Sequence, residues 1–543
     1  MLRVHADYPV EEAASYDSST FDTQLERVNT VLRERFHALP GLPTTSSKSA
    51  IENALSSLPK ELPRVGLGLK ETTSHLLETI SPALMPAQSG PRCFGLVLGG
   101  VTPAAQLADA IVTSYDPCVQ ELTASVAIEA LTLKYLLALL SLPGDVFNQN
   151  TITTGATSSN VLGLALGRNF VISSVKARQG IKDWSVPEDG YGGIEVDVFV
   201  IDAHASIRKA ASLVGIGRRN VVEVGSRELE EQGYWCCFDL AELESRLRAN
   251  LENGRGSIVA TSFGEVNTGV IPSDTPAVRR LCDKYSAWLH CDAAFGSFAV
   301  LHEDFQHYAS HLALADSITS DAHKWLNVPY DAGLFFSRKR SIPSASTNVV
   351  SLFDLTGPGS VVAAYLSSAS MAPPPHSPFP LLDATRKIPS PLFMNLENSR
   401  RFRALPIYAS LLSLGSEGYR SLVRRNVSFA RQIDSFLRSH QDYDVLTPDP
   451  SLSPHDPFAY KVLNIVLFAP AASAPERYRI ASPENPDPAT TFLAALNESK
   501  QMFVTGTSWR GRKAVRIAVS NWMTDERRDL EIVEGVLDQV MKE

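Results

Sequence analysis

Short strand-like runs alternate with helix-like segments between residues 91 and 345, and this alternation restricts the fold more than any other feature of the chain. Helical patterns separate runs that are rich in β-branched residues. Strands joined by helices form a mainly parallel sheet that is covered on both faces. The runs are TITTG, VDVFVIDAH, SIVATSF, AWLHCDAA, DSITSD and GLFFSRK. The sequence therefore predicts a large α/β domain.

Two further regions flank this domain. Residues 1–90 combine amphipathic segments such as FDTQLERVNTVLRERFHAL with Pro and Ser clusters, which predicts a helical amino-terminal arm. We expect the large domain to cover residues 91–390, of which 341–390 form a mobile, Pro- and Ser-rich loop region. Residues 391–543 carry a long helical region from about residue 395, the strand-like runs AYKVLNIVLF and AVRIAVSN, and a final helix. They predict a smaller α+β domain.

Composition excludes several classes of protein. A formal net charge of −9 on 543 residues argues against a nucleic-acid surface, because phosphate binding requires clustered Lys and Arg. The six cysteines have no spacing typical of a metal site or a disulfide framework, which favours a reducing compartment. No apolar signal core opens the chain, and the apolar run LKYLLALLSL is too short to span a bilayer. We expect a cytoplasmic protein without a metal.

Polar residues close several of the predicted strands, where an open α/β sheet binds its ligand. The turn from Gly155 to Asn160 follows a strand and opens a helix, so its backbone N–H groups can bind an anion. An ordinary strand-to-helix turn with a Ser or Thr cap explains the same residues. The turn becomes a candidate phosphate site only in combination with other residues.

Two charged residues at strand ends suggest a cofactor. Asp292 ends an apolar strand, where a carboxylate needs a cation: either a structural Arg or Lys, or the protonated ring nitrogen of a pyridine cofactor. Lys324 follows another strand, where a desolvated amine can form a Schiff base, although a lone lysine more often extends to the surface. His204 fits a helix start or an aromatic plate against a flat cofactor, and His323 fits a core residue or a phosphate donor.

Together and in this order, these motifs resemble those of the pyridoxal phosphate (PLP)-dependent group II amino-acid decarboxylases, which include aromatic amino-acid, glutamate and histidine types. The similarity covers most of residues 91–543. The matching motifs are Ala156-Thr157, His204, His290-Cys291-Asp292-Ala293-Ala294, Ala315-Asp316-Ser317 and His323-Lys324.

This resemblance implies PLP as the cofactor, bound as a Schiff base to Lys324. It also implies that Asp292 pairs with the pyridine nitrogen and that His204 stacks on the ring. The remaining contacts that it implies are Ala156, Thr157 and His323 at the phosphate and Ala294 at the other ring face.

The same resemblance implies the fold type I architecture of PLP enzymes, with a mainly parallel, seven-stranded sheet, and a homodimer. It implies decarboxylation of an L-amino acid to an amine, with aromatic amino acids as our first guess. Arg516 matches a small-domain arginine that can face a substrate carboxylate, although a surface charge on an edge strand explains it equally.

The chain departs from the family pattern at two places. Its loop from Gly264 to Gly269 carries Glu265 and Asn267 where the family is richer in Thr, so the polar role of that loop stays open. The stretch 366–395 lacks the tyrosine with which family members often protonate the substrate carbon, which leaves His376 and the preceding Tyr365 as candidates.

Two alternatives to simple decarboxylation remain. A PLP enzyme with the same site can couple decarboxylation to oxidative deamination, or cleave a carbon–carbon bond. A cofactor-free relative that has only inherited the fold is the other alternative, and the intact Lys324, Asp292 and His204 argue against it.

Overall fold

The structure is a computed structural model that describes residues 18–119, 123–225, 235–342, 349–357, 388, 391–450 and 460–542. The chain divides into two compact units. The smaller consists of Met1–Leu98, Ser435–Asp444 and Phe468–Glu543, and the larger of Gly99–Asp434 and Val445–Leu467. No described helix is long and apolar enough to cross a membrane.

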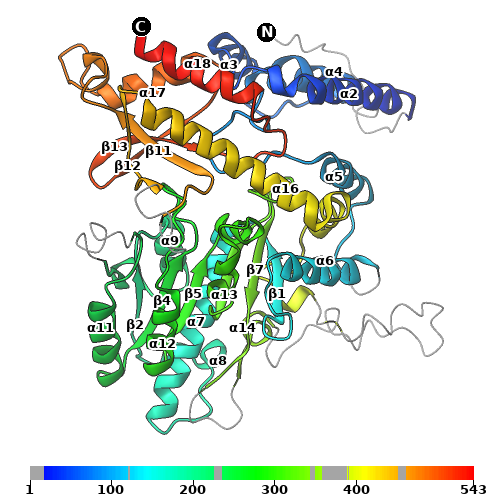
Figure 1. The fold of residues 1–543 in the computed structure, drawn as a ribbon. Coiled ribbons are helices and arrows are strands. Elements are labelled where there is room, and N and C mark those ends of the chain that lie inside the picture. Colours follow the sequence, from blue (N-terminus) through cyan, green and yellow to red (C-terminus); the bar gives the residue numbers. More distant parts are fainter. Residues whose placement is uncertain are drawn as a thin grey trace. The chain divides into compact units, whose positions relative to one another are not determined.

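The larger unit contains a seven-stranded sheet in the order β1-β7-β6-β5-β4-β2-β3 (Figure 1). Strand β7 is antiparallel to both of its neighbours, and the other pairs are parallel. The predicted α/β class with a mainly parallel sheet is therefore confirmed. The strands are β1 (Gln149–Thr153), β2 (Val196–Val200), β3 (Val221–Glu223), β4 (Gly256–Ser262), β5 (Trp288–Asp292), β6 (Ser317–Asp321) and β7 (Gly333–Ser337).

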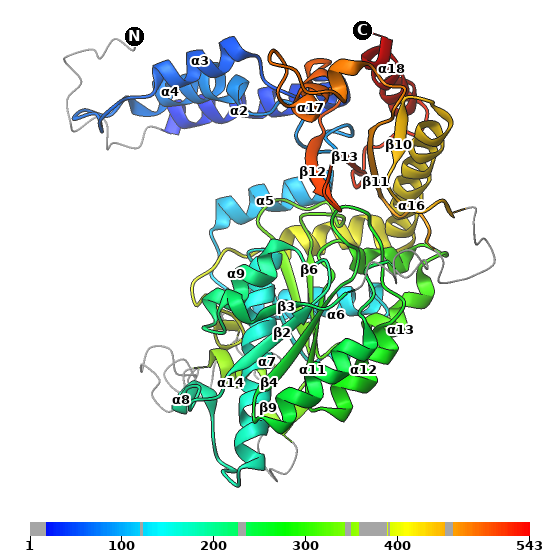
Figure 2. The ribbon, with the colours of Figure 1, turned by 90° about the vertical axis from the view of Figure 1, so that its left-hand side faces the viewer.

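Helices cover both faces of this sheet, as Figure 2 shows. Alternate residues of a strand point to opposite faces. In β2, Val198 packs in one core with α7 (Ala156–Arg178) and α9 (Ala205–Leu213). Its neighbour Phe199 packs in the other core with α11 (Leu240–Glu252) and α12 (Thr275–Lys284). The near-continuous apolar runs of the sequence reflect this burial on both sides.

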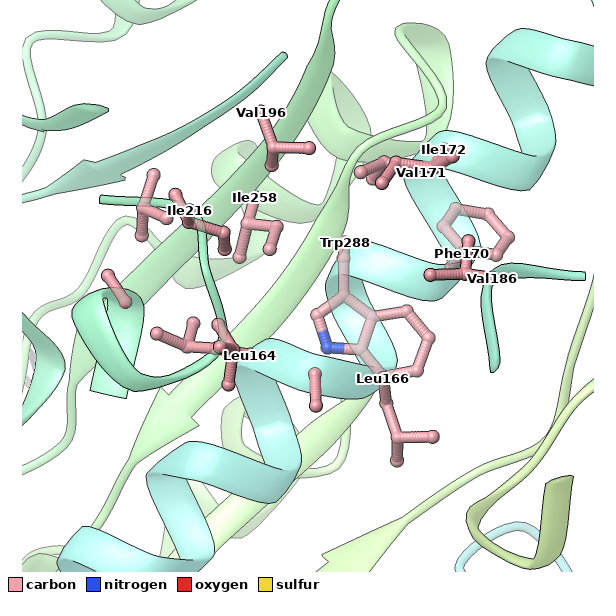
Figure 3. Close-up of a cluster of buried hydrophobic side chains, with 14 of the residues drawn as sticks. Leu164, Leu166, Phe170, Val171, Ile172, Val186, Val196, Ile216, Ile258 and Trp288 are labelled. Carbon is pink, nitrogen blue, oxygen red and sulfur yellow. The ribbon is translucent and has the colours of Figure 1, made fainter. Parts of the chain in front are cut away.

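Helix α7 crosses the middle of the sheet and is buried along most of its length. Its core includes the indole of Trp288 from β5, which lies against the helix in Figure 3. The rings of Trp288 and Phe170 have centroids 5.6 Å apart. This packing fixes the helix against the strand that ends in Asp292.

Two details differ from the sequence expectation. Strand β3 was not predicted, because three residues with one fully buried side chain give too short a pattern. The long helix α16 (Ala404–Ser439) begins later than the expected position near residue 395. Before it, the Asn395 amide donates hydrogen bonds to Ile152 O and Thr151 Oγ1 on β1, which keeps this segment out of the helix.

The smaller unit contains the amino-terminal helices and most of a four-stranded sheet in the order β10-β11-β13-β12. Its strands are β10 (Tyr443–Val445), β11 (Ile465–Pro470), β12 (Thr505–Trp509) and β13 (Arg512–Ala518). Its longer helices are α2 (Ser18–Ala38), α3 (Lys48–Ser57), α17 (Pro488–Glu498) and α18 (Arg528–Lys542). Helices α5 (Pro103–Tyr115) and α6 (Ser125–Leu139) belong to the larger unit.

Candidate active site

A cavity of about 290 Å³ opens at the carboxyl ends of the central strands. Its walls come from the β1–α7 turn and from the ends of β2, β4, β5 and β6. The structure brings seven of the predicted site residues together in this cavity. They are Ala156, Thr157, His204, Asp292, Ala294, His323 and Lys324.

The β1–α7 turn presents the first turn of a 23-residue helix to the cavity. Hydroxyl pairs fix its shape, with Thr154 Oγ1 2.7 Å from Ser158 Oγ and Thr153 Oγ1 2.7 Å from Ser159 Oγ. The N–H groups of a first helical turn lack partners within the helix and attract anions. The turn has the geometry that a phosphate site requires.

Lys324 points into the site rather than extending to the surface. Its Nζ lies 3.1 Å from the Oδ2 atom of Asp321, a carboxylate that is almost fully buried. Asp321 Oδ1 also accepts a hydrogen bond of 2.6 Å from the N–H of Ala156. Burial raises the pKa of Asp321, and the nearby Lys324 and His323 oppose this shift. Sequence reasoning assigned no role to Asp321, although its place three residues before Lys324 was visible.

The His323 ring is held at the same corner of the cavity. Its Nδ1 lies 2.9 Å from the Ala332 carbonyl oxygen, and its Nε2 lies 3.7 Å from Asp321 Oδ2. The Tyr330 ring packs on it with centroids 4.4 Å apart. Burial lowers the pKa of His323. A fixed ring next to the helix terminus suits the predicted contact with a phosphate.

Asp292 occupies the last position of β5 and is 8% exposed. Among the described residues, its hydrogen-bond partners are neutral: Asn160 Nδ2 at 2.8 Å and Ala294 N at 3.3 Å. The structural Arg or Lys that would also have explained a buried acid is not its partner in the described structure. The carboxylate is therefore available to a cation in the cavity.

His204 is both a helix start and a cavity residue. It is the N-cap of α9, where its Nδ1 accepts a hydrogen bond from the N–H of Ser206. The capping bond fixes the plane of an imidazole that lines the cavity. The two interpretations of this histidine are compatible.

The loop after β4 is built around Glu265, which is 1% exposed. Its carboxylate accepts hydrogen bonds from the backbone N–H groups of Asn267 and Thr268 and from the Thr268 hydroxyl. Gly264 and Val266 face the cavity instead. Burial raises the pKa of Glu265 to about 7. Glu265 thus folds the loop, and an apolar side chain occupies the adjacent cavity wall.

Of the three predicted substrate residues, the structure describes Arg516 alone. Arg516 belongs to the smaller unit, where its guanidinium donates a hydrogen bond of 2.9 Å to Gly95 O. It is 8% exposed on β13, which has a strand on each side, so the edge-strand alternative is wrong. Tyr365 and His376 lie outside the described residues.

The cavity fits PLP by size and by chemistry. Its volume is near the lower end of the range of small-ligand sites, about 300–1,000 Å³. A lysine amine, a buried carboxylate and an anion-binding helix terminus line the same space. These groups match the aldehyde, the pyridine nitrogen and the phosphate of PLP, in that order.

Comparison with known proteins agrees with this assignment. The family model described as pyridoxal-dependent decarboxylase conserved domain matches residues 58–357. An L-2,4-diaminobutyrate decarboxylase of Acinetobacter baumannii is 27% identical over 300 residues, which cover 54% of this chain and 52% of that protein. The match thus spans about half the length of that relative.

Solved structures share the fold over nearly the whole chain. Oryza sativa TDC, crystallised with PLP and tryptamine, superposes with a TM-score of 0.75 and 20% identity, covering 97% of this chain and 99% of that one. Rhodiola rosea 4-hydroxyphenylacetaldehyde synthase has a TM-score of 0.73 and 17% identity, covering 97% and 98%. The fold type I architecture is therefore confirmed. Since the family model matches more than half of the chain, this protein belongs to the pyridoxal-dependent decarboxylase family, whose cofactor is PLP.

Proposed function

We propose that this protein removes the α-carboxyl group of an L-amino acid, with PLP bound at Lys324. The observation that carries the proposal is the convergence of the Lys324 amine and the buried Asp292 carboxylate on one cavity beside the N-terminus of α7. This set of groups serves no evident purpose in a relative that has lost the cofactor. Membership of the decarboxylase family supports the reaction type.

PLP, when bound, supplies an aldehyde that links covalently to amines and a ring that accepts the electron pair left by a departing carboxyl group. The residues of this chain provide the rest. With PLP bound, Asp292 would hold a proton at the ring nitrogen and His204 would lie against the ring. Lys324 would bind the cofactor. Asp321 is close enough to exchange a proton with this lysine, since its Oδ2 atom lies 3.1 Å from Lys324 Nζ. The first turn of α7 binds the phosphate.

The nature of the substrate side chain is open within this proposal. Relatives and structural neighbours carry names that refer to diaminobutyrate and to aromatic compounds, and aromatic amino acids stay our first guess. A panel of amino acids, with carbon dioxide, amine, aldehyde and peroxide followed together, tests both the reaction and the substrate. Absence of carbon dioxide release from the PLP-loaded protein with every amino acid would contradict the proposal.

Decarboxylation coupled to oxidative deamination is a second outcome to test, because a structural neighbour is an aldehyde synthase. If no acid protonates the substrate carbon, dioxygen can oxidise it, and the products are aldehyde, ammonia and peroxide. His376→Phe should lower amine formation by about 10²–10⁴-fold if His376 is that acid. Tyr365→Phe is the matched variant in the same stretch. Aldehyde and peroxide from the wild-type protein, formed only with oxygen, would favour oxidative deamination.

We further propose a homodimer. Helix α5 carries an apolar stripe at Leu107, Ile111 and Tyr115, which are 69%, 50% and 80% exposed in the single chain. In the smaller unit, Leu55 and Leu62 are 64% and 95% exposed. Apolar surface of this kind is typical of an interface between subunits.

We also propose a cytoplasmic location, because all six cysteines are free.

A further inference from the structure

Helix α7 packs so closely on β5 that its glycines are required there. A Cβ atom added to Gly163 would lie 2.3 Å from His290 Cε1, and one added to Gly167 would lie 2.8 Å from Trp288 Cδ1. Both rings come from alternate positions of β5 and face the helix. Asn160 precedes Gly163 by nearly one helical turn on the same side of α7. This register places the Asn160 amide at the next inward position of β5, which is Asp292.

The Asn160 side chain has no exposed surface and uses both of its polar atoms. Its Nδ2 donates hydrogen bonds to Asp292 Oδ2 at 2.8 Å and to Ser206 Oγ at 3.0 Å. Its Oδ1 lies 2.8 Å from His290 Nε2. The amide is therefore the junction between Asp292, Ser206 and His290.

The chemistry of the groups fixes the direction of these hydrogen bonds. An ionised Asp292 only accepts, so the amide nitrogen of Asn160 faces it and the amide oxygen faces His290. That oxygen also only accepts, so His290 carries its proton on Nε2. Complete burial lowers the pKa of His290 to about 4 and keeps it neutral, which leaves Nδ1 as an acceptor. Ser317 Oγ lies 2.8 Å from Nδ1 and accepts from Trp288 Nε1 at 2.9 Å, so its own proton points to His290.

A branch of the same chain reaches His204. Its Nδ1 accepts from the N–H of Ser206 at 3.2 Å and therefore carries no proton. The Ser206 hydroxyl, which accepts from Asn160, lies 2.8 Å from the same Nδ1 and can donate to it. His204 thus has its ring proton on Nε2. One amide orients both groups that the proposed function places against the cofactor ring.

We infer that Asn160 is the positioning residue of the cofactor site: its amide holds the Asp292 carboxylate in the orientation that keeps the ring nitrogen of PLP protonated. The 2.8 Å hydrogen bond from Asn160 Nδ2 fixes the orientation of the Asp292 carboxylate, which is too buried for water to do so. The inference rests on the proposed function, because Asp292 serves a ring nitrogen only when PLP is bound. It assigns Asn160 a role that neither the motifs nor the family match provides.

The test uses full-length protein loaded with PLP that is ¹⁵N-labelled at the pyridine nitrogen. The ¹⁵N chemical shift reports the protonation of that nitrogen directly, without turnover. Asn160→Leu removes the donor at similar volume, and Asn169→Leu is the matched control, because Asn169 is a buried asparagine elsewhere on α7. We expect a shift toward the unprotonated value near neutral pH in Asn160→Leu only. We also expect kcat to fall by about 10- to 100-fold, as for a lost hydrogen bond to a charged group.

Asn160→Asp provides a second measurement that a purely structural role would not explain. Two facing carboxyl groups cannot both ionise readily, so one of them retains a proton to higher pH. In that form the carboxyl group introduced by Asn160→Asp can donate to Asp292 as the amide does. The ¹⁵N shift of this variant should therefore change with pH, whereas the shift of the wild type should stay constant over the same range. If Asn160→Leu does not retain PLP, the pH dependence of the Asn160→Asp ¹⁵N shift tests the role of Asn160 instead.

Asp292→Asn separates failure of the inference from failure of the proposed function. If Asp292→Asn keeps the wild-type ¹⁵N shift, Asp292 does not serve the ring nitrogen and the proposed function loses that assignment. If Asp292→Asn changes the shift, two results overturn the role of Asn160. One is a wild-type shift in Asn160→Leu, and the other is an Asn160→Asp shift that does not depend on pH.

Discussion

Replacing Gly163 by alanine tests how closely helix α7 must approach β5. In a helix, alanine is favoured over glycine by about 1 kcal/mol. The new Cβ at Gly163, however, would lie 2.3 Å from Cε1 and 2.4 Å from Nδ1 of the His290 ring, more than 1 Å inside a normal contact of about 3.5 Å. Overpacking a tight core costs about 1–3 kcal/mol and offsets this gain, so we expect Gly163→Ala to be destabilising by up to about 2 kcal/mol. His290 would also move, and PLP affinity should fall with it.

The control is Gly535→Ala on α18, where an added Cβ meets nothing within 4 Å. There the helix propensity acts alone, so this variant should be as stable as the wild type or slightly more stable. Both are compared by apparent Tm at one scan rate, because a chain of this size can unfold irreversibly. Titration of the apoprotein with PLP gives the affinity. If Gly163→Ala is as stable as Gly535→Ala and binds PLP normally, the close packing of α7 on β5 is not required.

Three further outcomes are expected. Lys324→Ala should abolish turnover and the absorption band of lysine-bound cofactor; retention of both would remove Lys324 from the mechanism. Burial raises the pKa of Glu265 from its ordinary 4.5 to about 7. The protonated side chain therefore contributes to the free energy of unfolding below pH 4.5, and this contribution is lost as the pH rises to about 7. The contribution is at most roughly 3 kcal/mol. Glu265→Gln should lack this pH dependence in denaturant unfolding, and an unchanged profile would contradict the assignment. Leu107→Glu combined with Ile111→Glu should produce monomers in sedimentation analysis, whereas the exposed Ile480→Glu should not.

Most of the site could be predicted because its residues follow strands that are recognisable in the sequence. Lys324, Asp292 and His204 each stand at or just after the carboxyl end of a strand-like run, and parallel strands bring such ends to one edge of the sheet. The structure places them in one cavity, as expected. Glu265 was harder to interpret, because a loop sequence does not show whether a carboxylate points to the ligand or, as here, caps its own loop.

The sequence by itself determined the layered α/β architecture and the family, since both depend on local patterns and on the order of short motifs. Only the tertiary structure decided which side chains support these motifs. Asn160 and His290 are 130 residues apart, and their contact depends on the register of α7 over β5. A helix sequence shows which residues share a face but not which strand that face covers. The contact between Asp321 and the N-terminus of α7, 165 residues away, was hidden for the same reason.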